Sequence, residues 1–361
     1  MAAFREGTVV RISERSERVV RVQVEIGTAN VEAIGFPSML GVLENGDRVV
    51  VNTTGIEMHL GTGGVGFVLW NLDGGHDIDP GPGHIMKMRY TPWQTEVSAV
   101  EAPESAHHGS LASVDEIGGM PVVACGLHSQ IAGVAAGIRR RRPDAVIGYL
   151  MTDAGALPLA FSELVHSLQQ SGLIDATCTS GHAFGGDLEA VNLFSGLAAL
   201  RVVAGSDVVI AAMGPGLAGT GTVLGFSGIE QGQIVDATNA LGGRPFACLR
   251  VSFGDERVRH QGLSHHTVTA LTLGCRTPAT IGVPDLADGL SRTLWSQLGT
   301  AGIDHRHELV AADGTGGKRL LEEKGLDVLS MGRSMHRAPE AVLAAAAVGG
   351  LAAEAIRSQP P

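Results

Sequence analysis

The chain has 361 residues, of which 44% are apolar and 17% are charged, so it can bury a substantial core and is not a disordered chain. Its net charge is −11 and its pI is about 5.7, which argues against electrostatic binding to nucleic acid, and no nucleic-acid partner is expected. Glycine is unusually frequent, with 51 residues, whereas aromatic residues make up only 4%.

The N-terminal segment gives no sign of export. It acquires charge at Arg5 and Glu6 and lacks the apolar core of a secretory signal. No apolar run reaches the roughly 18 residues that a transmembrane helix needs. The sequence therefore predicts a cytoplasmic protein without membrane contact. The cysteines show no CxxC spacing, so neither a zinc ribbon nor a disulfide framework is expected, and we expect them to be reduced and mostly buried. They are Cys125, Cys178, Cys248 and Cys275.

Short strands dominate the first part of the chain. Residues 20–26 alternate apolar and polar side chains, which is the period of a half-buried strand. Glycine-rich turns at 46–47 and 61–64 separate further apolar runs. This pattern favours a small barrel or sandwich. The predicted strands cover residues 20–26, 48–54, 65–70 and 84–90.

A change of composition then marks a domain boundary. The segment EAPESAHHG, residues 101–109, is polar and contains proline, as linkers often do. We expect a β-rich, barrel-like module over residues 1–105, a linker over 106–118 and a Rossmann-like α/β domain over 119–361.

Beyond Met120 short apolar runs alternate with helical patterns, which is typical of an α/β fold. Strands that are apolar throughout are buried on both faces, so we expect a mainly parallel sheet flanked by helices. The predicted strands cover residues 121–126, 145–151, 175–179, 207–213, 245–253, 279–283, 308–311 and 327–331. The alanine-rich segment 341–356 is predicted to be a helix that covers the core, with dimerisation as the alternative. Whether the protein forms a homo-oligomer therefore stays open.

Polar residues follow five of these strands, at the carboxyl ends where open parallel sheets bind ligands. Loops on a rigid sheet can bring such side chains together, and we interpret the histidines and aspartates among them as an acid/base or metal-binding set. The catalytic candidates are Asp153, His182, Asp187, His265 and His266. His128 and Ser129, which follow the first of these strands, are candidate ligand-binding residues.

A glycine-rich loop follows the fourth strand. Gly214, Gly216 and Gly219 fit G-x-G-x-x-G, in which backbone amides approach a pyrophosphate at a helix N-terminus. A proline at position 215 and the missing ribose-binding acid make a dinucleotide site less favoured than a general phosphate or oxyanion cradle. Tight turns and close packing explain these glycines equally well. The candidate ligand-binding residues here are Gly214, Gly216, Gly219, Thr220, Gly221 and Thr222.

A metal site at the same strand ends is a second possibility. Imidazole and carboxylate ligands suit Zn, Mn or Fe, but no H-E-x-x-H string is present, so any ligands would have to converge from separate strands. Hydrogen-bonded loop histidines or acid/base roles are the alternatives. Cys178 lies near His182 in sequence and is a weaker candidate nucleophile, because a small buried cysteine is commoner at a strand end.

Two kinds of cofactor chemistry are not expected. The three lysines, Lys87, Lys318 and Lys324, all lie outside residues 128–266, which argues against a Schiff-base or PLP mechanism at these loops. The string Gly316-Gly317-Lys318 fails the P-loop pattern, because position 312 is alanine and position 319 is arginine. A P-loop ATP site is therefore not expected.

Three strings carry a family resemblance: HAFGGDLEAVN at 182–192, MGPGLAGTGTVLGFSGIEQG at 213–232 and GLSHHT at 262–267. They resemble a bacterial protein family of unknown function that is found widely in actinobacteria. The resemblance covers nearly the whole chain, including GDRVVVNTT and GTGG in the N-terminal part. It implies a two-part cytosolic protein without an established activity, and it supplies no catalytic residue.

Two functions stay open at this point. The favoured one is an enzyme of the hydrolase or isomerase type that binds a small anionic or phosphorylated metabolite at the strand carboxyl ends. The alternative is a non-catalytic sensor, in which the α/β part binds a ligand and the β-rich module contacts a partner. Stoichiometric bound metal would favour the enzyme.

Overall fold

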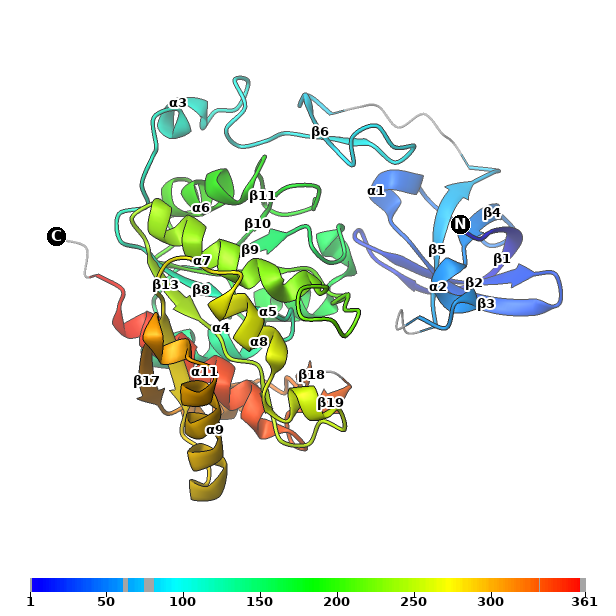
Figure 1. The fold of residues 1–361 in the computed structure, drawn as a ribbon. Coiled ribbons are helices and arrows are strands. Elements are labelled where there is room, and N and C mark those ends of the chain that lie inside the picture. Colours follow the sequence, from blue (N-terminus) through cyan, green and yellow to red (C-terminus); the bar gives the residue numbers. More distant parts are fainter. Residues whose placement is uncertain (1, 61–63, 75–80, 331, 358–361) are drawn as a thin grey trace. The chain divides into compact units, whose positions relative to one another are not determined.

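The structure is a computed structural model that describes residues 2–60, 64–74, 81–330 and 332–357. The chain forms two compact units, Met1–Pro82 and Gly83–Pro361 (Figure 1). The boundary near residue 105 that the composition suggested differs from this division, because residues 83–105 pack with the second unit. Lys87, for example, donates hydrogen bonds to two carbonyls of that unit. Most of the turn expected at 61–64 lies outside the described residues.

The first unit contains a closed barrel of five strands in the order β1-β2-β3-β5-β4. Neighbouring strands are antiparallel except β3 and β5, and β1 closes the barrel by pairing with both β2 and β4. Val20, Val22 and Val24 point into the core, whereas the polar residues between them do not, as the alternation predicted. The elements are β1 (Phe4–Arg15), β2 (Val20–Ile26), β3 (Ala29–Gly35), α1 (Pro37–Leu40), β4 (Arg48–Asn52), α2 (Thr54–Glu57) and β5 (Gly66–Asn71).

The second unit is built on an eight-stranded parallel sheet in the order β11-β10-β9-β12-β8-β13-β16-β17. Its central strands are buried along their whole length, which explains their uninterrupted apolar sequence. The strands are β8 (Pro121–Ala124), β9 (Ile147–Thr152), β10 (Ala176–Thr179), β11 (Leu188–Glu189), β12 (Val208–Met213), β13 (Arg244–Ala247), β16 (Thr280–Pro284) and β17 (Glu308–Ala312). The predicted α/β class with an N-terminal barrel is thus confirmed.

Two of the predicted strands differ in the structure. The stretch 245–253 divides into β13 and the short β14 (Val251–Ser252), which pairs with β15 (Gly262–Leu263). The stretch 327–331 stays outside the main sheet, because β18 (Leu329–Ser330) pairs with β19 (Arg333–Ser334); Met331 lies outside the described residues. The strand predicted at 84–90 is the shorter β6 (Ile85–Lys87), which pairs with β7 (Thr95–Val97) in the second unit.

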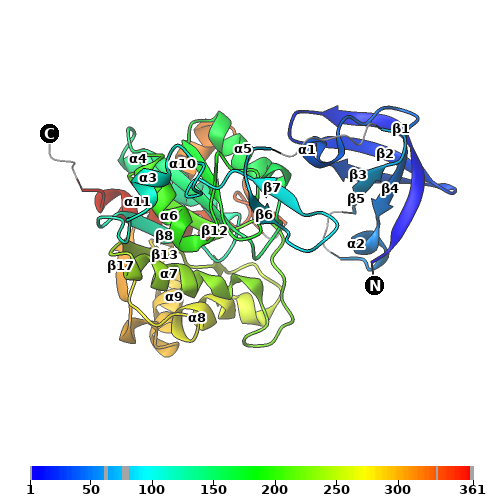
Figure 2. The ribbon, with the colours of Figure 1, turned by 90° about the horizontal axis from the view of Figure 1, so that it is seen from above.

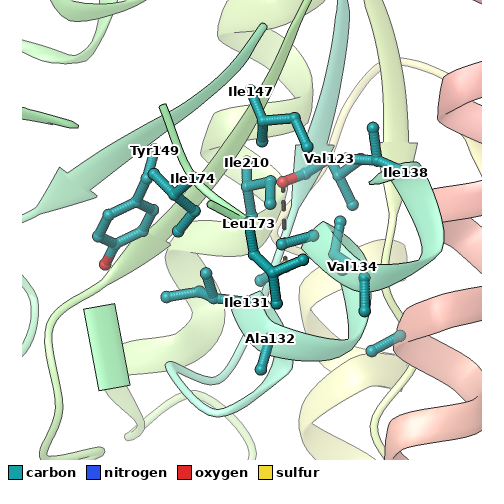
Figure 3. Close-up of a cluster of buried hydrophobic side chains, with 14 of the residues drawn as sticks. Val123, Ile131, Ala132, Val134, Ile138, Ile147, Tyr149, Leu173, Ile174 and Ile210 are labelled. Carbon is teal, nitrogen blue, oxygen red and sulfur yellow. Dashed lines mark hydrogen bonds between the residues drawn. The ribbon is translucent and has the colours of Figure 1, made fainter. Parts of the chain in front are cut away.

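Helices cover both faces of this sheet. Figure 2 shows α4, α10 and α11 on one side of the strands and α7, α8 and α9 on the other. The apolar core therefore has two halves, and Val123 and Ile210 face α4 in the half drawn in Figure 3. The helices are α3 (His108–Leu111), α4 (Gln130–Arg141), α5 (Glu163–Gln170), α6 (Leu193–Val202), α7 (Glu230–Ala240), α8 (His265–Thr272), α9 (Asp288–Thr300), α10 (Thr315–Glu323) and α11 (Pro339–Glu354).

The alanine-rich helix α11 packs directly on α4. Its small side chains let the two backbones approach so closely that a Cβ on Gly137 would lie 2.1 Å from the carbonyl oxygen of Ala346. The helix is largely buried, so it covers the core, as the sequence predicted. Among the described residues, no helix combines the length and the hydrophobicity needed to cross a bilayer.

Candidate functional site

A pocket opens between the loops that follow β8 and β12. Its volume is about 450 Å³, and its walls include His128 and Ser129 after β8 and Gly214 and Gly216 after β12. Four of the predicted ligand-binding residues therefore meet in one place, which we call the β8–β12 pocket. Strand β8 leads into α4 on one face and β12 leads into α7 on the other, so the pocket lies where the winding of the sheet changes direction, the usual place for a ligand in such folds.

His128 is held in a defined tautomer. Its Nδ1 lies 3.0 Å from the carbonyl oxygen of Met213, so this nitrogen carries the proton, and its Nε2 accepts from the Ser162 hydroxyl at 2.7 Å. Ser162 also caps α5 by accepting from Val165 N. Burial lowers the pKa of His128 to about 4. The imidazole is therefore neutral at physiological pH, and its unprotonated nitrogen is occupied by the Ser162 hydroxyl.

The glycine-rich loop after β12 folds back on itself. Thr220 N donates to Gly225 O, and the hydroxyls of Thr220 and Thr222 lie 2.9 Å apart. Helix α7 begins only at Glu230, so the loop does not lead directly into a helix N-terminus as the G-x-G-x-x-G dinucleotide motif requires. A Cβ on Gly214 would lie 2.3 Å from the carbonyl oxygen of Ala156, so this glycine is required by close backbone packing.

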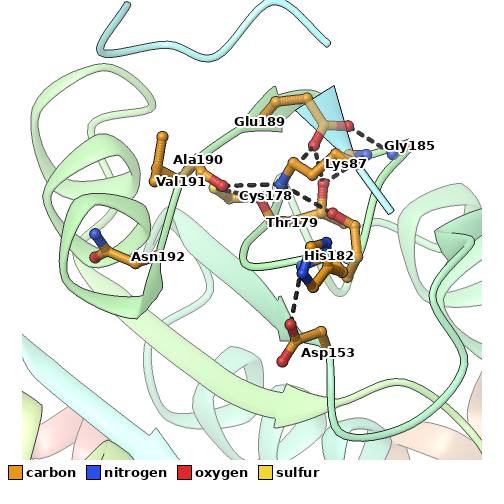
Figure 4. A network of polar contacts seen from close by, with 12 residues as sticks. Lys87, Asp153, Cys178, Thr179, His182, Gly185, Glu189, Ala190, Val191 and Asn192 are labelled. Carbon is orange, nitrogen blue, oxygen red and sulfur yellow. Dashed lines mark hydrogen bonds and ion pairs between the residues drawn. The ribbon is translucent and has the colours of Figure 1, made fainter. Parts of the chain in front are cut away.

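Two of the predicted catalytic residues lie side by side. The backbone N–H of His182 donates to Asp153 Oδ2 at 2.9 Å (Figure 4), and His182 Nδ1 accepts from the backbone N–H of Met88 at 3.0 Å. The remaining proton of a neutral His182 is therefore on Nε2. Asp187 points elsewhere, because its Oδ2 accepts from both the N–H and the hydroxyl of Thr177 at 2.8 Å. Asp187 thus anchors a loop and does not join His182.

Glu230 is a functional candidate that the sequence did not single out. The hydroxyl of Thr152, at the end of β9, donates to Glu230 Oε1. Burial raises the pKa of Glu230 to about 7, and the neighbouring charge of Asp153 adds to the rise. Acidic residues are common in the first turn of a helix because they complement its dipole, so the sequence position of Glu230 gave no reason to look further.

The two predicted histidines of α8 join a third, and we call the three the histidine cluster. One ring nitrogen from each of His260, His265 and His266 lies within 4.8 Å of the others, a spacing compatible with a metal ion. Phe226 stacks on His266 with a centroid distance of 4.0 Å. This contact connects the glycine-rich loop to the cluster.

Arg250 argues against a cation in the histidine cluster. Its Nη1 lies 3.1 Å from His266 Nδ1, and because a guanidinium only donates, that nitrogen accepts and the proton of His266 is on Nε2. Burial and then the charge of Arg250 lower the pKa of His266 to about 3 and that of His260 to about 4. The surroundings are cationic and the imidazoles are neutral, so a metal ion would have to bind against the charge of Arg250.

A buried ion pair lies beside His182 (Figure 4). Lys87 is 1% exposed, and its Nζ donates to Ala183 O, Ala190 O and, at 3.4 Å, Glu189 Oε2. Sequence reasoning missed this lysine because it lies about a hundred positions before its partners. Its amino group is held by these three oxygen atoms, so Lys87 gives no support to a Schiff-base mechanism.

The cysteines are free and buried, as expected. Cys178 lies next to the ion pair, and burial raises the pKa of its thiol far above the ordinary value. A thiol with a raised pKa is a poor nucleophile. The structure therefore favours a packing role for Cys178.

Residues 32–349 match the model of one protein family, described as a protein of unknown function, DUF3866. No curated protein matches the chain. The match covers nearly the whole chain, as the resemblance in the three glycine- and histidine-rich strings predicted. It assigns no activity to any residue, so the chemistry has to be inferred from the site.

Proposed function

Because the chain belongs to the DUF3866 family of proteins of unknown function, we propose its role from the site alone: an enzyme of the hydrolase or isomerase type that binds a small anionic or phosphorylated metabolite at the carboxyl edge of the sheet. The observation that carries the proposal is the β8–β12 pocket. Its volume falls within the roughly 300–1,000 Å³ of small-molecule sites, and like them it has mostly apolar walls with a few polar groups.

A group that can exchange protons at neutral pH lies at the same edge. Glu230 has a pKa of about 7, and general acid/base catalysis works best when the pKa of the group is near the working pH. Asp153 is its charged neighbour, and it also holds the backbone of His182. Proton transfer by Glu230, with Asp153 as its neighbour, is the chemistry that supports the enzyme over the sensor.

Ligand-induced thermal stabilisation tests the proposal, with a panel of phosphorylated and carboxylated metabolites. Ser167 lines the β8–β12 pocket, and Gln170 is exposed on the same helix. Ser167→Phe should abolish the stabilisation by a pocket ligand, whereas Gln170→Phe should retain it. Turnover of that ligand should be lost in Glu230→Gln while its binding persists. Binding without turnover in the wild type would support the sensor, and a ligand unaffected by Ser167→Phe would contradict the pocket.

The spacing of the histidine cluster favours one second candidate, metal-assisted hydrolysis. Three imidazoles could hold zinc and leave a position for water. Elemental analysis tests this without a substrate. Stoichiometric zinc in the purified protein that is lost in His265→Gln would support it, and its absence in both proteins would leave proton transfer by Glu230 as the mechanism.

A further inference from the structure

A second, smaller cavity lies beyond the carboxyl end of β13. Its volume is about 20 Å³, and we call it the arginine cavity because Arg250 and Arg333 form part of its wall. The other polar side chains of its wall are Gln130, Ser252, Asp255 and Ser330. The first turns of α4 and α11 complete it, through Gln130 and through alanines at 338 and 341.

Three buried polar atoms of this wall have no hydrogen-bond partner among the residues that the structure describes. They are Arg250 Nη2, Ser252 Oγ and Arg333 Nε. Arg250 as a whole is only 7% exposed. Buried polar groups in proteins are almost always paired, because an unpaired one loses its hydration without compensation. Three such atoms around one cavity indicate that a polar group occupies it.

The charge of the wall indicates the sign of that group. The carboxylate of Asp255 is shared by Arg257 and Arg333, each at 2.9 Å, and these arginines hold its pKa far below the usual range. Arg250 instead contacts a neutral acceptor, His266 Nδ1. Burial and the charge of Arg257 lower the pKa of Arg250 to about 10, so it stays protonated at neutral pH.

The two helices add to this field. α4 and α11 both direct their N-terminal turns at the arginine cavity, and the N-terminal end of a helix dipole attracts negative charge. Glu340 in the first turn of α11 is already engaged, because its Oε1 accepts from Phe253 N. Positive potential therefore dominates inside the cavity.

We propose that the arginine cavity binds a phosphate or carboxylate group through Arg250 Nη2, Arg333 Nε and Ser252 Oγ. The volume admits about one oxygen-sized group, so an anion inserts an oxygen and the rest of the ligand lies outside. Leu127 belongs to the walls of both this cavity and the β8–β12 pocket. The two cavities are therefore neighbours, and the proposal places the anionic end of a metabolite in that pocket at the arginines. Only this last step rests on the proposed function.

Calorimetric titration of the full-length protein with inorganic phosphate tests the anion site, with potassium chloride at equal ionic strength as the reference and acetate as the carboxylate probe. Ser252→Ala removes a hydroxyl that has no partner in the described residues, so it should leave the fold intact while weakening phosphate binding by about tenfold. Arg333→Gln should weaken it at least as much. Arg292→Gln removes the same charge from an exposed side chain on α9 and should leave binding unchanged.

Binding that is equal in Ser252→Ala, Arg333→Gln and the wild type would overturn the inference, and so would the absence of phosphate and acetate binding, since a water molecule would then fill the cavity. Phosphate binding that depends on Ser252 and Arg333 supports the anion site even if no metabolite is turned over. In that case only the proposed enzyme would fall. Conversely, if a ligand binds in the β8–β12 pocket but neither phosphate nor acetate binds to the arginine cavity, this inference alone would be overturned.

Discussion

Nζ of Lys87 lies 3.4 Å from Oε2 of Glu189 in a region closed to solvent. Burial lowers the pKa of Lys87 and raises that of Glu189, so desolvation disfavours the charged form of each group more than the mutual attraction favours it. The pair nevertheless fastens β6 to β11 and to the segments on either side of it, because the same ammonium group also donates to Ala183 O and Ala190 O.

Lys87→Met should destabilise the second unit by about 3 kcal/mol, because it leaves the buried Glu189 carboxylate without its opposite charge and two carbonyls without their donor. The double variant Lys87→Met with Glu189→Gln should recover part of this loss, since the buried charge is then gone. Urea denaturation of the full-length protein measures both, with Lys324→Met on the exposed surface as the control. A single variant as stable as the wild type would show that the hairpin β6–β7 is not held by this lysine.

Glu230 should make the protein less stable as the pH rises. Its pKa is about 7 in the folded state and about 4.5 when it is exposed, so between these values the folded state binds more protons than the unfolded state, and the free energy of unfolding falls with increasing pH. Glu230→Gln remains neutral and can still accept from the Thr152 hydroxyl. The free energy of unfolding of the variant should equal that of the wild type near pH 4.5 and exceed it by up to about 3 kcal/mol at pH 8.

Urea denaturation at a series of pH values measures this difference. Thr152→Val provides the matched control, because it removes the hydrogen bond that lowers the pKa of Glu230 and should move the midpoint of the pH dependence upward. A difference between Glu230→Gln and the wild type that does not change with pH would mean that Glu230 is ionised throughout, and it would remove the candidate acid/base group.

The sequence carried the information for most of the sheet and for the β8–β12 pocket. Strands β9 and β12 are buried on both faces, so almost all of their positions are apolar and the sequence pattern identifies them as strands. Parallel strands all end at the same edge, which is why His128 and Gly214 could be placed together although 86 positions separate them.

Other features depend on side-chain directions that periodicity does not encode. His182 and Asp187 lie in one short loop, yet only His182 meets Asp153, because Asp187 turns back to Thr177. The burial of Glu230 comes from packing between segments distant in sequence, and a charged residue on a helix looks the same whether it is buried or exposed. The two-residue strand β11 is too short to leave a pattern.

The close crossing of α4 and α11 makes a prediction with opposite signs at two glycines. Alanine is favoured over glycine in a helix by about 1 kcal/mol, so Gly350→Ala, where a new Cβ meets nothing within 4 Å, should stabilise the protein by up to that amount. At Gly137 the same Cβ would lie 2.1 Å from Ala346 O, a rigid backbone atom. Gly137→Ala should therefore destabilise by about 1–3 kcal/mol, as overpacking does. Thermal or urea unfolding of the two variants decides the matter, because stabilisation by both would mean that α4 and α11 are not in backbone contact.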